Sequence, residues 1–284
     1  MKNIMQGAAL DAAKKELVGM TFNGYEVSDI KPISVEKIGG THEGIEVSYK
    51  DSPVGNVFYG ISSVEELKDA IKSSLNEGIE SVRALITPHN TDLYRLRAIN
   101  FEANEDFLKD KPYKQVYDLA IIGFFDFGKG TGVLNNVTLK GLDITFDEFY
   151  EAALENIRGE VKIVPMLELL SGLIGEDEDL QSEDMGDCPL FVVGDGCHPE
   201  STALLGDQKW LEDIHCKLGD FYIIPSSVNE LLISPAAILP AEEILPMVGM
   251  INSGCVAPEE VLSNNIYKFD GTLSIISALD TATA

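Results

Sequence analysis

Residues 191–206, FVVGDGCHPESTALLG, place a cysteine, a histidine, two acids, a serine and a threonine directly after an apolar run. A thiol becomes a nucleophile when a base takes its proton, so Cys197 with His198 or His215 is a candidate thiol site. An adjacent histidine seldom reaches its neighbour's sulfur in line, and no third group that would orient the base is identifiable. The plainer interpretation is a connecting loop, in which Gly194 and Gly196 turn the chain after a strand.

The same residue types raise the question of a metal site. Zinc sites usually take their ligands from C-x2-C or H-x3-H pairs, which present both side chains to the ion. Here Cys197–His198 and His215–Cys216 are adjacent pairs, and adjacent side chains point apart on a strand and on a helix. No Walker loop is present, and no G-x-G-x-x-G follows a predicted strand. We therefore expect no metal and no cofactor.

Ser226 and Ser227 follow Pro225 between two apolar runs and form a further candidate. A serine nucleophile of the hydrolase kind stands in a G-x-S-x-G turn, which is missing here. Ser226 therefore stays beside Cys197 and His198 as an alternative catalytic residue. Turn or capping hydroxyls between two strands are the plainer interpretation.

Charge is distributed unevenly along the chain. The formal net charge is −26, from 21 basic and 47 acidic side chains. Residues 1–140 hold 16 bases and 20 acids, whereas residues 141–284 hold 5 bases and 27 acids. Such a surface repels phosphate groups, so we expect no direct contact with nucleic acid or with an anionic membrane. A basic protein is the expected partner.

The densest acidic stretch is GEDEDLQSEDMGD, residues 175–187, which has seven acids and no base. It lacks the central glycine and the closing glutamate of an EF-hand loop, so a calcium site is not expected. We predict a solvated loop that supplies the binding acids. These are Glu176, Asp177, Glu178, Asp179, Glu183, Asp184 and Asp187.

Hydrophobic periodicity and turn residues predict helices between groups of strands. Strands are expected at 25–34, 44–50, 56–61, 117–127, 132–140, 188–193, 220–225 and 230–235, with a hairpin at 265–276. Helices are expected at 6–17, 62–75, 104–110, 145–157, 207–218, 240–252 and 258–262. The motif of serine or threonine followed three residues later by glutamate predicts capping boxes at Ser62–Glu65 and Thr145–Glu148.

Strands grouped in hairpins, with helices inserted between the groups, predict an α+β protein. We expect antiparallel sheets with helices packed on one face. The expected division is an α+β region at 1–112 and an acidic α+β domain at 113–284. No export signal and no run of about 18 apolar residues is recognisable, so a cytoplasmic location with free thiols is expected.

Several stretches in order, from HNTDLYRLRAINFEANEDFLKDKPYKQVYDLAIIGFF at 89–125 to APEEVLSNNIYKFD at 257–270, resemble a known family. It is the uncharacterised Firmicutes family known as domain of unknown function 5688. PSS before a bulky apolar run and the EEVLS ending are the most specific pieces, and the resemblance extends from about residue 20. It implies an association with mobile elements. Members often have a histidine where this chain has Asn229, so the resemblance implies no Ser–His pair at Ser226.

These observations favour a non-enzymatic cytoplasmic protein that binds a basic partner through an acidic surface. A sharper form of this hypothesis is a DNA-mimicking antagonist of a nuclease or another defence protein. The alternative is a hydrolase or thiol enzyme built on Cys197, His198 and Ser226. The sequence does not indicate an oligomeric state.

Overall fold

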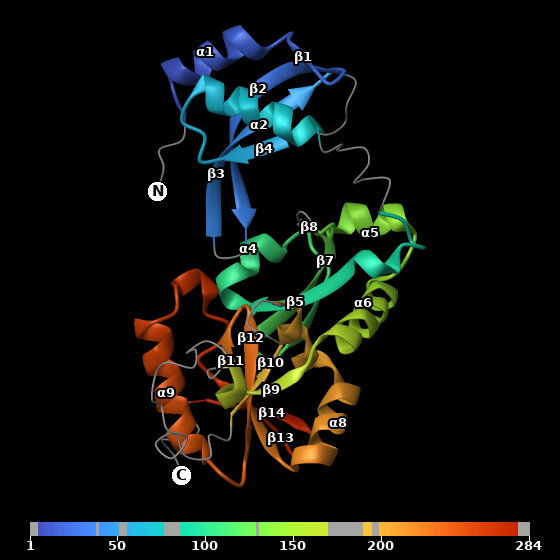
Figure 1. The fold of residues 1–284 in the computed structure, drawn as a ribbon, viewed down its shortest axis with the longest axis vertical. Coiled ribbons are helices and arrows are strands. Elements are labelled where there is room, and N and C mark those ends of the chain that lie inside the picture. The colour runs from blue at the N-terminus through green and yellow to red at the C-terminus, as the bar shows by residue number, and fades with distance from the viewer. Residues whose placement is uncertain are drawn as a thin grey trace. The chain divides into compact units, whose positions relative to one another are not determined.

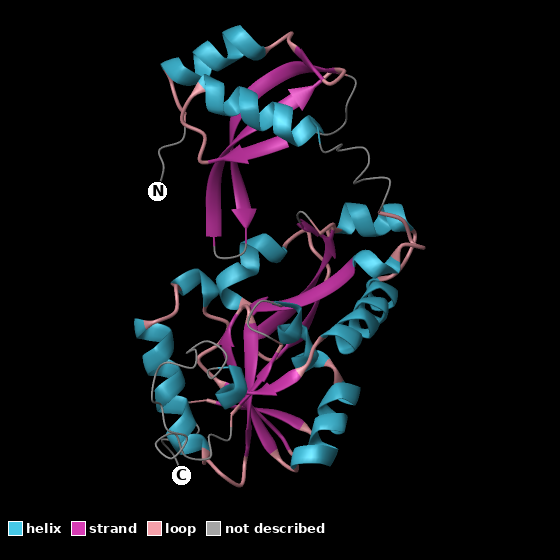
Figure 2. Cartoon of the chain, viewed as in Figure 1, coloured by secondary structure: helices cyan, strands magenta, loops and turns pink. Residues whose placement is uncertain are grey.

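The computed structural model describes residues 5–37, 40–50, 56–76, 86–128, 131–169, 190–194 and 199–277. The chain divides into two compact units, Met1–Thr87 and Pro88–Ala284 (Figure 1). Both units combine helices with antiparallel sheets, as the colouring in Figure 2 shows. The α+β class predicted from the sequence is therefore confirmed.

The first unit packs two helices against one antiparallel sheet. Its elements are α1 (Ala8–Leu17), β1 (Thr21–Phe22), β2 (Tyr25–Lys37), β3 (Gly40–Tyr49), β4 (Asn56–Tyr59) and α2 (Val64–Asn76). The strand order is β1-β2-β3-β4, so every strand pairs with its neighbour in sequence. Both helices cover the same face of this sheet (Figure 1).

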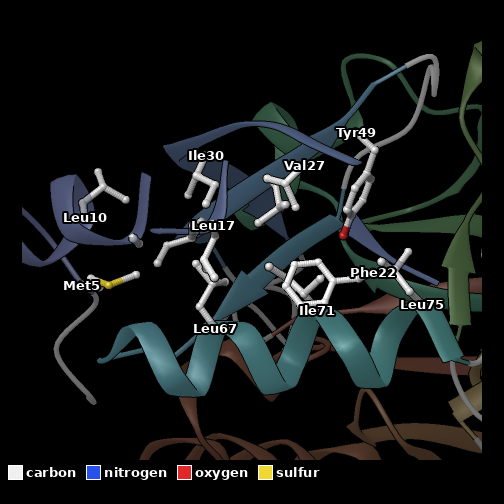
Figure 3. Close-up of a cluster of buried hydrophobic side chains, with 13 residues drawn as sticks. Met5, Leu10, Leu17, Phe22, Val27, Ile30, Tyr49, Leu67, Ile71 and Leu75 are labelled. Carbon is white, nitrogen blue, oxygen red and sulfur yellow. The ribbon is translucent and has the colours of Figure 1, made fainter. Parts of the chain in front are cut away.

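The core of the first unit follows from residue spacing. Leu67, Ile71 and Leu75 recur every four residues on α2 and point toward the sheet (Figure 3). Ile45 and Val47, two residues apart on β3, belong to the same buried cluster. Each such side chain contributes about 1.5–3 kcal/mol when it is fully buried. The helical and strand periods thus meet in one apolar layer.

The β2–β3 hairpin is longer than predicted. The glycines of GGTHEG were expected to separate two strands, but pairing continues from Ile33–Gly44 to Lys37–Gly40. Gly44 is required inside the sheet, because a Cβ there would lie 2.7 Å from Cγ1 of Val57. Close packing against β4, and not a turn, explains this glycine.

The two predicted capping boxes have different outcomes. The box at Thr145–Glu148 is confirmed, with both reciprocal hydrogen bonds present. The box at Ser62–Glu65 is wrong by one residue, because Ser63 Oγ accepts the N–H of Glu66 at 3.2 Å. The Glu66 carboxylate then accepts the Ser62 N–H at 2.8 Å. Ser62 and Ser63 both fit the motif, so the sequence alone could not choose between them.

The second unit contains two sheets and the helices around them. Its first elements are η1 (Thr91–Leu93), β5 (Tyr94–Asn100), η2 (Glu102–Asn104), α4 (Glu105–Leu108), β6 (Tyr113–Val116), β7 (Leu119–Asp126), β8 (Thr131–Val133), α5 (Asn136–Leu142), α6 (Phe146–Glu160) and β9 (Ile163–Pro165). The rest are β10 (Phe191–Val193), η3 (Pro199–Gly206), α8 (Gln208–Leu218), β11 (Phe221–Ser227), β12 (Glu230–Pro235), α9 (Ala241–Gly254), η4 (Pro258–Glu260), β13 (Ile266–Phe269) and β14 (Leu273–Ile276).

Strand β7 is the centre of the smaller sheet. It lies between β5 on one side and β6 and β8 on the other, and all of its residues except Asp126 are buried. Helix α6 packs on one face, where the ring of Phe149 stacks on Tyr94 with the centroids 4.3 Å apart. Gly123 makes room for that ring, because a Cβ there would lie 2.6 Å from Cε1 of Phe149.

One prediction in this region needs correction, and one strand was not predicted. The strand predicted at 132–140 is wrong beyond Val133, because α5 begins there with Asn135 as its cap. The Asn135 side chain accepts the N–H of Thr138 at 2.8 Å, a hydrogen bond that favours helix over strand. The unpredicted strand β5 pairs with β7 along its whole length. Residues 94–100 therefore pack with the second unit, and the division at Thr87 lies before the expected boundary at 112.

The larger sheet has the order β14-β13-β11-β12-β10-β9 and is antiparallel throughout. Helices α8 and α9 lie on opposite sides of it (Figure 1). Apolar residues of α9 pack with Tyr222 and Ile224 of β11. On α8, the ring of His215 contacts Phe269 of β13, which pairs with Phe221 of β11. Phe221 and Tyr222 are neighbours on one strand and point to opposite faces, so α8 and α9 cover opposite faces of the sheet.

Asp118, in the turn between β6 and β7, joins the two sheets. Its carboxylate accepts hydrogen bonds from Ser263 Oγ at 2.6 Å, from Asn265 Nδ2 at 3.0 Å and from the Tyr267 hydroxyl at 2.6 Å. Tyr267 is fully buried, and burial followed by the nearby Asp118 charge raises its pKa far above the usual range. The Tyr267 hydroxyl is therefore a permanent donor to this carboxylate.

We expect Asp118→Ala to lower the free energy of unfolding by about 3 kcal/mol, because the buried donors of Ser263 and Tyr267 lose their acceptor. Urea denaturation followed by circular dichroism measures this change. The control Asp106→Ala removes an exposed pair with Lys109 and should cost less than about 1 kcal/mol. Equal losses in the two variants would show that Asp118 does not hold the sheets together.

Candidate functional site

Most of the residues predicted to form a site lie outside the described part of the chain. This applies to Cys197, to His198 and to the seven acids of residues 175–187. Ser226 lies in β11, where the register with β12 shifts between Ile224 and Ser227, but its side chain is not described. These assignments remain predictions. The hydroxyl of Ser227 accepts the N–H of Asn229 at 3.1 Å, which is the turn role expected for this pair of serines.

The described thiols, Cys216 and Cys255, lie on the surface of the second unit, and His215 is half-buried. Cys216 on α8 and Cys255 after α9 are both exposed and form no disulfide. The buried side of α8 consists of Trp210, Leu211 and Ile214, which leaves Cys216 in solvent. His215 Nε2 lies 3.0 Å from Asp220 Oδ1. Within the described ranges, no group of three histidine, cysteine or acidic side chains could hold a metal ion.

Helix α6 carries a row of exposed acids. Asp147, Glu151 and Glu155 are four residues apart, so they lie on one side of the helix and recur about every 6 Å. Arg158 on the same helix binds Asp207, with Nη2 at 2.8 Å from Oδ1. The hydrogen bond to Asp207 raises the pKa of Arg158, and the charges of Asp207, Glu151 and Glu155 add to this rise. The row itself forms no ion pair with a described base.

The same pattern holds across the acidic half of the chain. Of the eighteen described acids in residues 141–284, four lie within ion-pair distance of a described base: Glu160, Asp207, Asp220 and Asp270. The other fourteen are Asp143, Asp147, Glu148, Glu151, Glu155, Glu168, Glu200, Glu212, Asp213, Glu230, Glu242, Glu243, Glu259 and Glu260. All of these except Glu200 and Glu230 are exposed.

A second feature is a set of buried polar atoms around η3. Among the described side chains, five buried polar atoms have no hydrogen-bond partner: Arg97 Nε, Tyr150 Oη, Glu200 Oε2, Ser201 Oγ and Ser234 Oγ. They lie on η3 or on β5, α6 and β12, each of which contacts η3. Thr202 anchors η3 to the edge of β5, since its Oγ1 accepts the N–H of Ala98 at 2.9 Å. Unpartnered buried groups are uncommon and often mark a functional region.

Burial and nearby charges shift the pKa values of two side chains near η3, Arg97 and Tyr150. Burial lowers the pKa of Arg97, and the nearby Glu200 opposes this shift. The guanidinium of Arg97 also lies 5.1 Å from the centre of the Phe124 ring, a cation–π distance. Burial, followed by the charges of Asp207 and Glu151, raises the pKa of Tyr150 well above its usual range.

Arg97 and Tyr150 do not converge on one site. Arg97 pairs across the sheet with Ile122, so both project from the same face. The Tyr150 hydroxyl lies at Gly206, where a Cβ would also contact Ile121. Ile121 and Ile122 are neighbours on one strand and point to opposite faces. The described part of the η3 region therefore contains no nucleophile–base pair.

Sequence reasoning missed the η3 region and its arginine. In YRLRAIN, residues 94–100, arginine alternates with apolar residues, and this period of two was the available signal for a strand. The burial of Arg97 and the lack of a hydrogen-bond partner for the Tyr150 hydroxyl depend on packing between segments far apart in sequence. No local sequence pattern predicts these two features.

The fold and the charge distribution define an α+β protein whose residues 141–284 are acidic. Most of the described acids in this range form no ion pair. The sequence model of a family described as "Family of unknown function (DUF5688)" matches residues 64–271, which is more than half of the chain. The chain therefore belongs to this family. No curated protein and no solved structure matches it. No described helix is both long enough and apolar enough to cross a membrane.

Thiol labelling tests whether Cys197 is an activated nucleophile. In iodoacetamide labelling of the folded protein followed by peptide mass spectrometry, we expect Cys197 to react no faster than the exposed Cys216 and Cys255. An enzyme thiol would instead react at least about tenfold faster at neutral pH, since the thiolate is the reactive form. A fast reaction of Cys197 that His198→Ala abolishes and His215→Ala leaves unchanged would contradict the non-enzymatic interpretation.

Proposed function

We propose that this protein is a non-enzymatic binding factor that docks a basic protein partner through the acidic surface of residues 141–284. One observation carries the proposal: fourteen of the eighteen described acids in this range have no ion pair with a described base. Their charge is therefore available to a partner.

The physical effect of such a surface is mainly kinetic and selective. A continuous negative potential attracts a basic protein over several ångströms and speeds its association, while it repels nucleic acid and anionic membranes. On α6, the row of Asp147, Glu151 and Glu155 presents a regular series of negative charges about 6 Å apart. Exposed ion pairs contribute little individually, so several acids have to act together.

In a sharper form of the proposal, the partner is a protein that normally binds nucleic acid. A regular row of carboxylates presents negative charge as a phosphate backbone does, so it competes for the same basic groove. A cytoplasmic antagonist of a nuclease or another defence protein, encoded on a mobile element, would have this property.

A hydrolase or thiol enzyme using Cys197, His198 and Ser226 is the second candidate. One observation favours it: η3 begins at Pro199, directly after His198, and the unpartnered buried polar atoms of the described residues lie on η3 or on elements that contact it. Activated thiols stand in electropositive, partly exposed surroundings. The labelling experiment above separates the two candidates.

Affinity purification from the native host tests the docking proposal. At about 50 mM salt the chain should retain proteins of basic isoelectric point, and these should be lost at about 500 mM, because salt screens exposed charges beyond a few ångströms. A variant with Asp147→Asn, Glu151→Gln and Glu155→Gln should retain at least about threefold less.

The matched control neutralises three exposed acids of the first unit, with Asp11→Asn, Glu65→Gln and Asp69→Asn. It carries the same change in net charge and should retain the basic proteins as the unmodified chain does. A parallel variant that neutralises Glu176, Asp177, Glu178 and Asp179 measures the share of the acidic loop. The proposal fails when no basic protein is retained at low salt.

A further inference from the structure

Helix α9 has an exposed apolar side. Ala241, Ile244, Leu245 and Val248 face the larger sheet and belong to its buried cluster. On the solvent side, Met247, Met250 and Ile251 are 41%, 67% and 47% exposed. Monomeric proteins seldom leave neighbouring large apolar side chains in water, and those that do often use them for binding.

The exposed residues form a continuous stripe. At 3.6 residues per turn, Glu243, Met247, Met250 and Gly254 lie one above the other on α9, with Ile251 beside them. Ile238, in the turn before the helix, is 58% exposed. We call Met247, Met250 and Ile251 the methionine stripe. Its unbranched thioether side chains adapt to different apolar surfaces, as methionines do at other binding faces.

A shallow hollow lies at the end of the helix, beside the stripe's last turn and lined by other residues of α9. It measures about 560 Å³ and lies between the last turns of α9 and the segment around η4, lined in part by Gly254, Val256, Pro258 and Val261. Asn252 fixes the two segments together, since its Nδ2 donates to the Ser263 carbonyl at 2.9 Å. The hollow is therefore fixed, and its lining is part apolar and part polar, with Asn252, Ser253 and Asn264 among the polar residues.

Acids stand before and after the stripe in the sequence, and Glu243 lies one turn before Met247 on the same side of α9. Residues 236–266 contain Glu242, Glu243, Glu259 and Glu260 and no lysine, arginine or histidine. Glu242 and Glu243 stand in the first turn of α9, and Glu259 and Glu260 stand in η4. All four are exposed, and none forms an ion pair with a described base. The face therefore combines an apolar centre with a negative rim.

We propose that the methionine stripe docks one amphipathic helix of the basic partner, an assignment that rests on the proposed function. The apolar side of that helix packs on Met247, Met250 and Ile251. Its lysines and arginines meet the glutamates of α9 and η4. Helix α9 has 14 residues and is about 21 Å long, which matches several turns of a partner helix.

The negative rim selects this occupant over two others. A second copy of the chain would pair the stripe with itself about a two-fold axis, and residues 236–266 of either copy would offer the other acids and no base. An anionic membrane would meet the same repulsion. A basic amphipathic helix satisfies both the apolar centre and the rim.

A labelled leucine–lysine peptide of about 18 residues, with its lysines on one helical side, is the probe. Fluorescence anisotropy against the full chain measures its affinity, and a peptide of the same composition in scrambled order measures charge attraction alone. We expect the amphipathic peptide to bind at least tenfold more tightly than the scrambled one. Met247→Glu with Met250→Glu should weaken its binding at least tenfold.

Two further variants serve as controls. Val137→Glu adds a charge at an apolar residue of α5 that is 81% exposed, and it should change the affinity by less than twofold. Met247→Gln with Met250→Gln removes the apolar contact without adding charge and should weaken binding to a similar degree as the glutamates. Circular dichroism and thermal unfolding check that all variants stay folded.

The outcomes separate this inference from the proposed function. Both peptides could bind in a salt-sensitive way, and equally to the unmodified chain and to the methionine variants. That result leaves the acidic docking proposal intact and overturns the assignment to α9. Absence of any binding at low salt overturns both. Sedimentation velocity that shows a dimer dissociated by Met250→Glu assigns the stripe to a second copy and also overturns the inference.

Discussion

A shortage of bases constrains how the second unit is held together. Residues 141–284 contain 5 bases for 27 acids, so most carboxylates cannot be paired inside the protein. A buried carboxylate then needs hydrogen bonds or one of the few cations. Asp207 is buried and takes Arg158 as its partner. The half-buried Asp118, which precedes this range, joins the two sheets through the neutral donors Ser263, Asn265 and Tyr267.

The same shortage determines the surface. Lys268 is placed between Asp220 and Asp270, and Arg95 reaches Glu160 from β5. The remaining described acids of this range, apart from Glu200 and Glu230, stay exposed, where water solvates their charge. Folding of the core and exposure of negative charge are therefore two consequences of one composition. The acids that the fold does not use are the ones that a partner could use.

Charge alone gives attraction without a defined geometry. On α9, the exposed Met247 and Met250 add an apolar contact surface of defined position. Glutamates stand before them in the first turn of α9 and after them in η4. The region around η3 differs, since Arg97 and Tyr150 project from opposite faces of the smaller sheet. Their buried groups support the packing of η3 against β5 without forming a constellation of reacting groups.

The sequence by itself determined the fold class, the apolar strand β7, the cap of α6 and the charge imbalance. Each depends on residues close in sequence or on composition: the apolar run 119–125, Thr145 with Glu148, and the counts of acids and bases. Only the tertiary structure decided which acids are paired, that Gly44 and Gly123 serve packing, that Cys216 is exposed and that α9 leaves its methionines in water. These features arise where segments far apart in sequence meet, and local periodicity carries no information about such contacts.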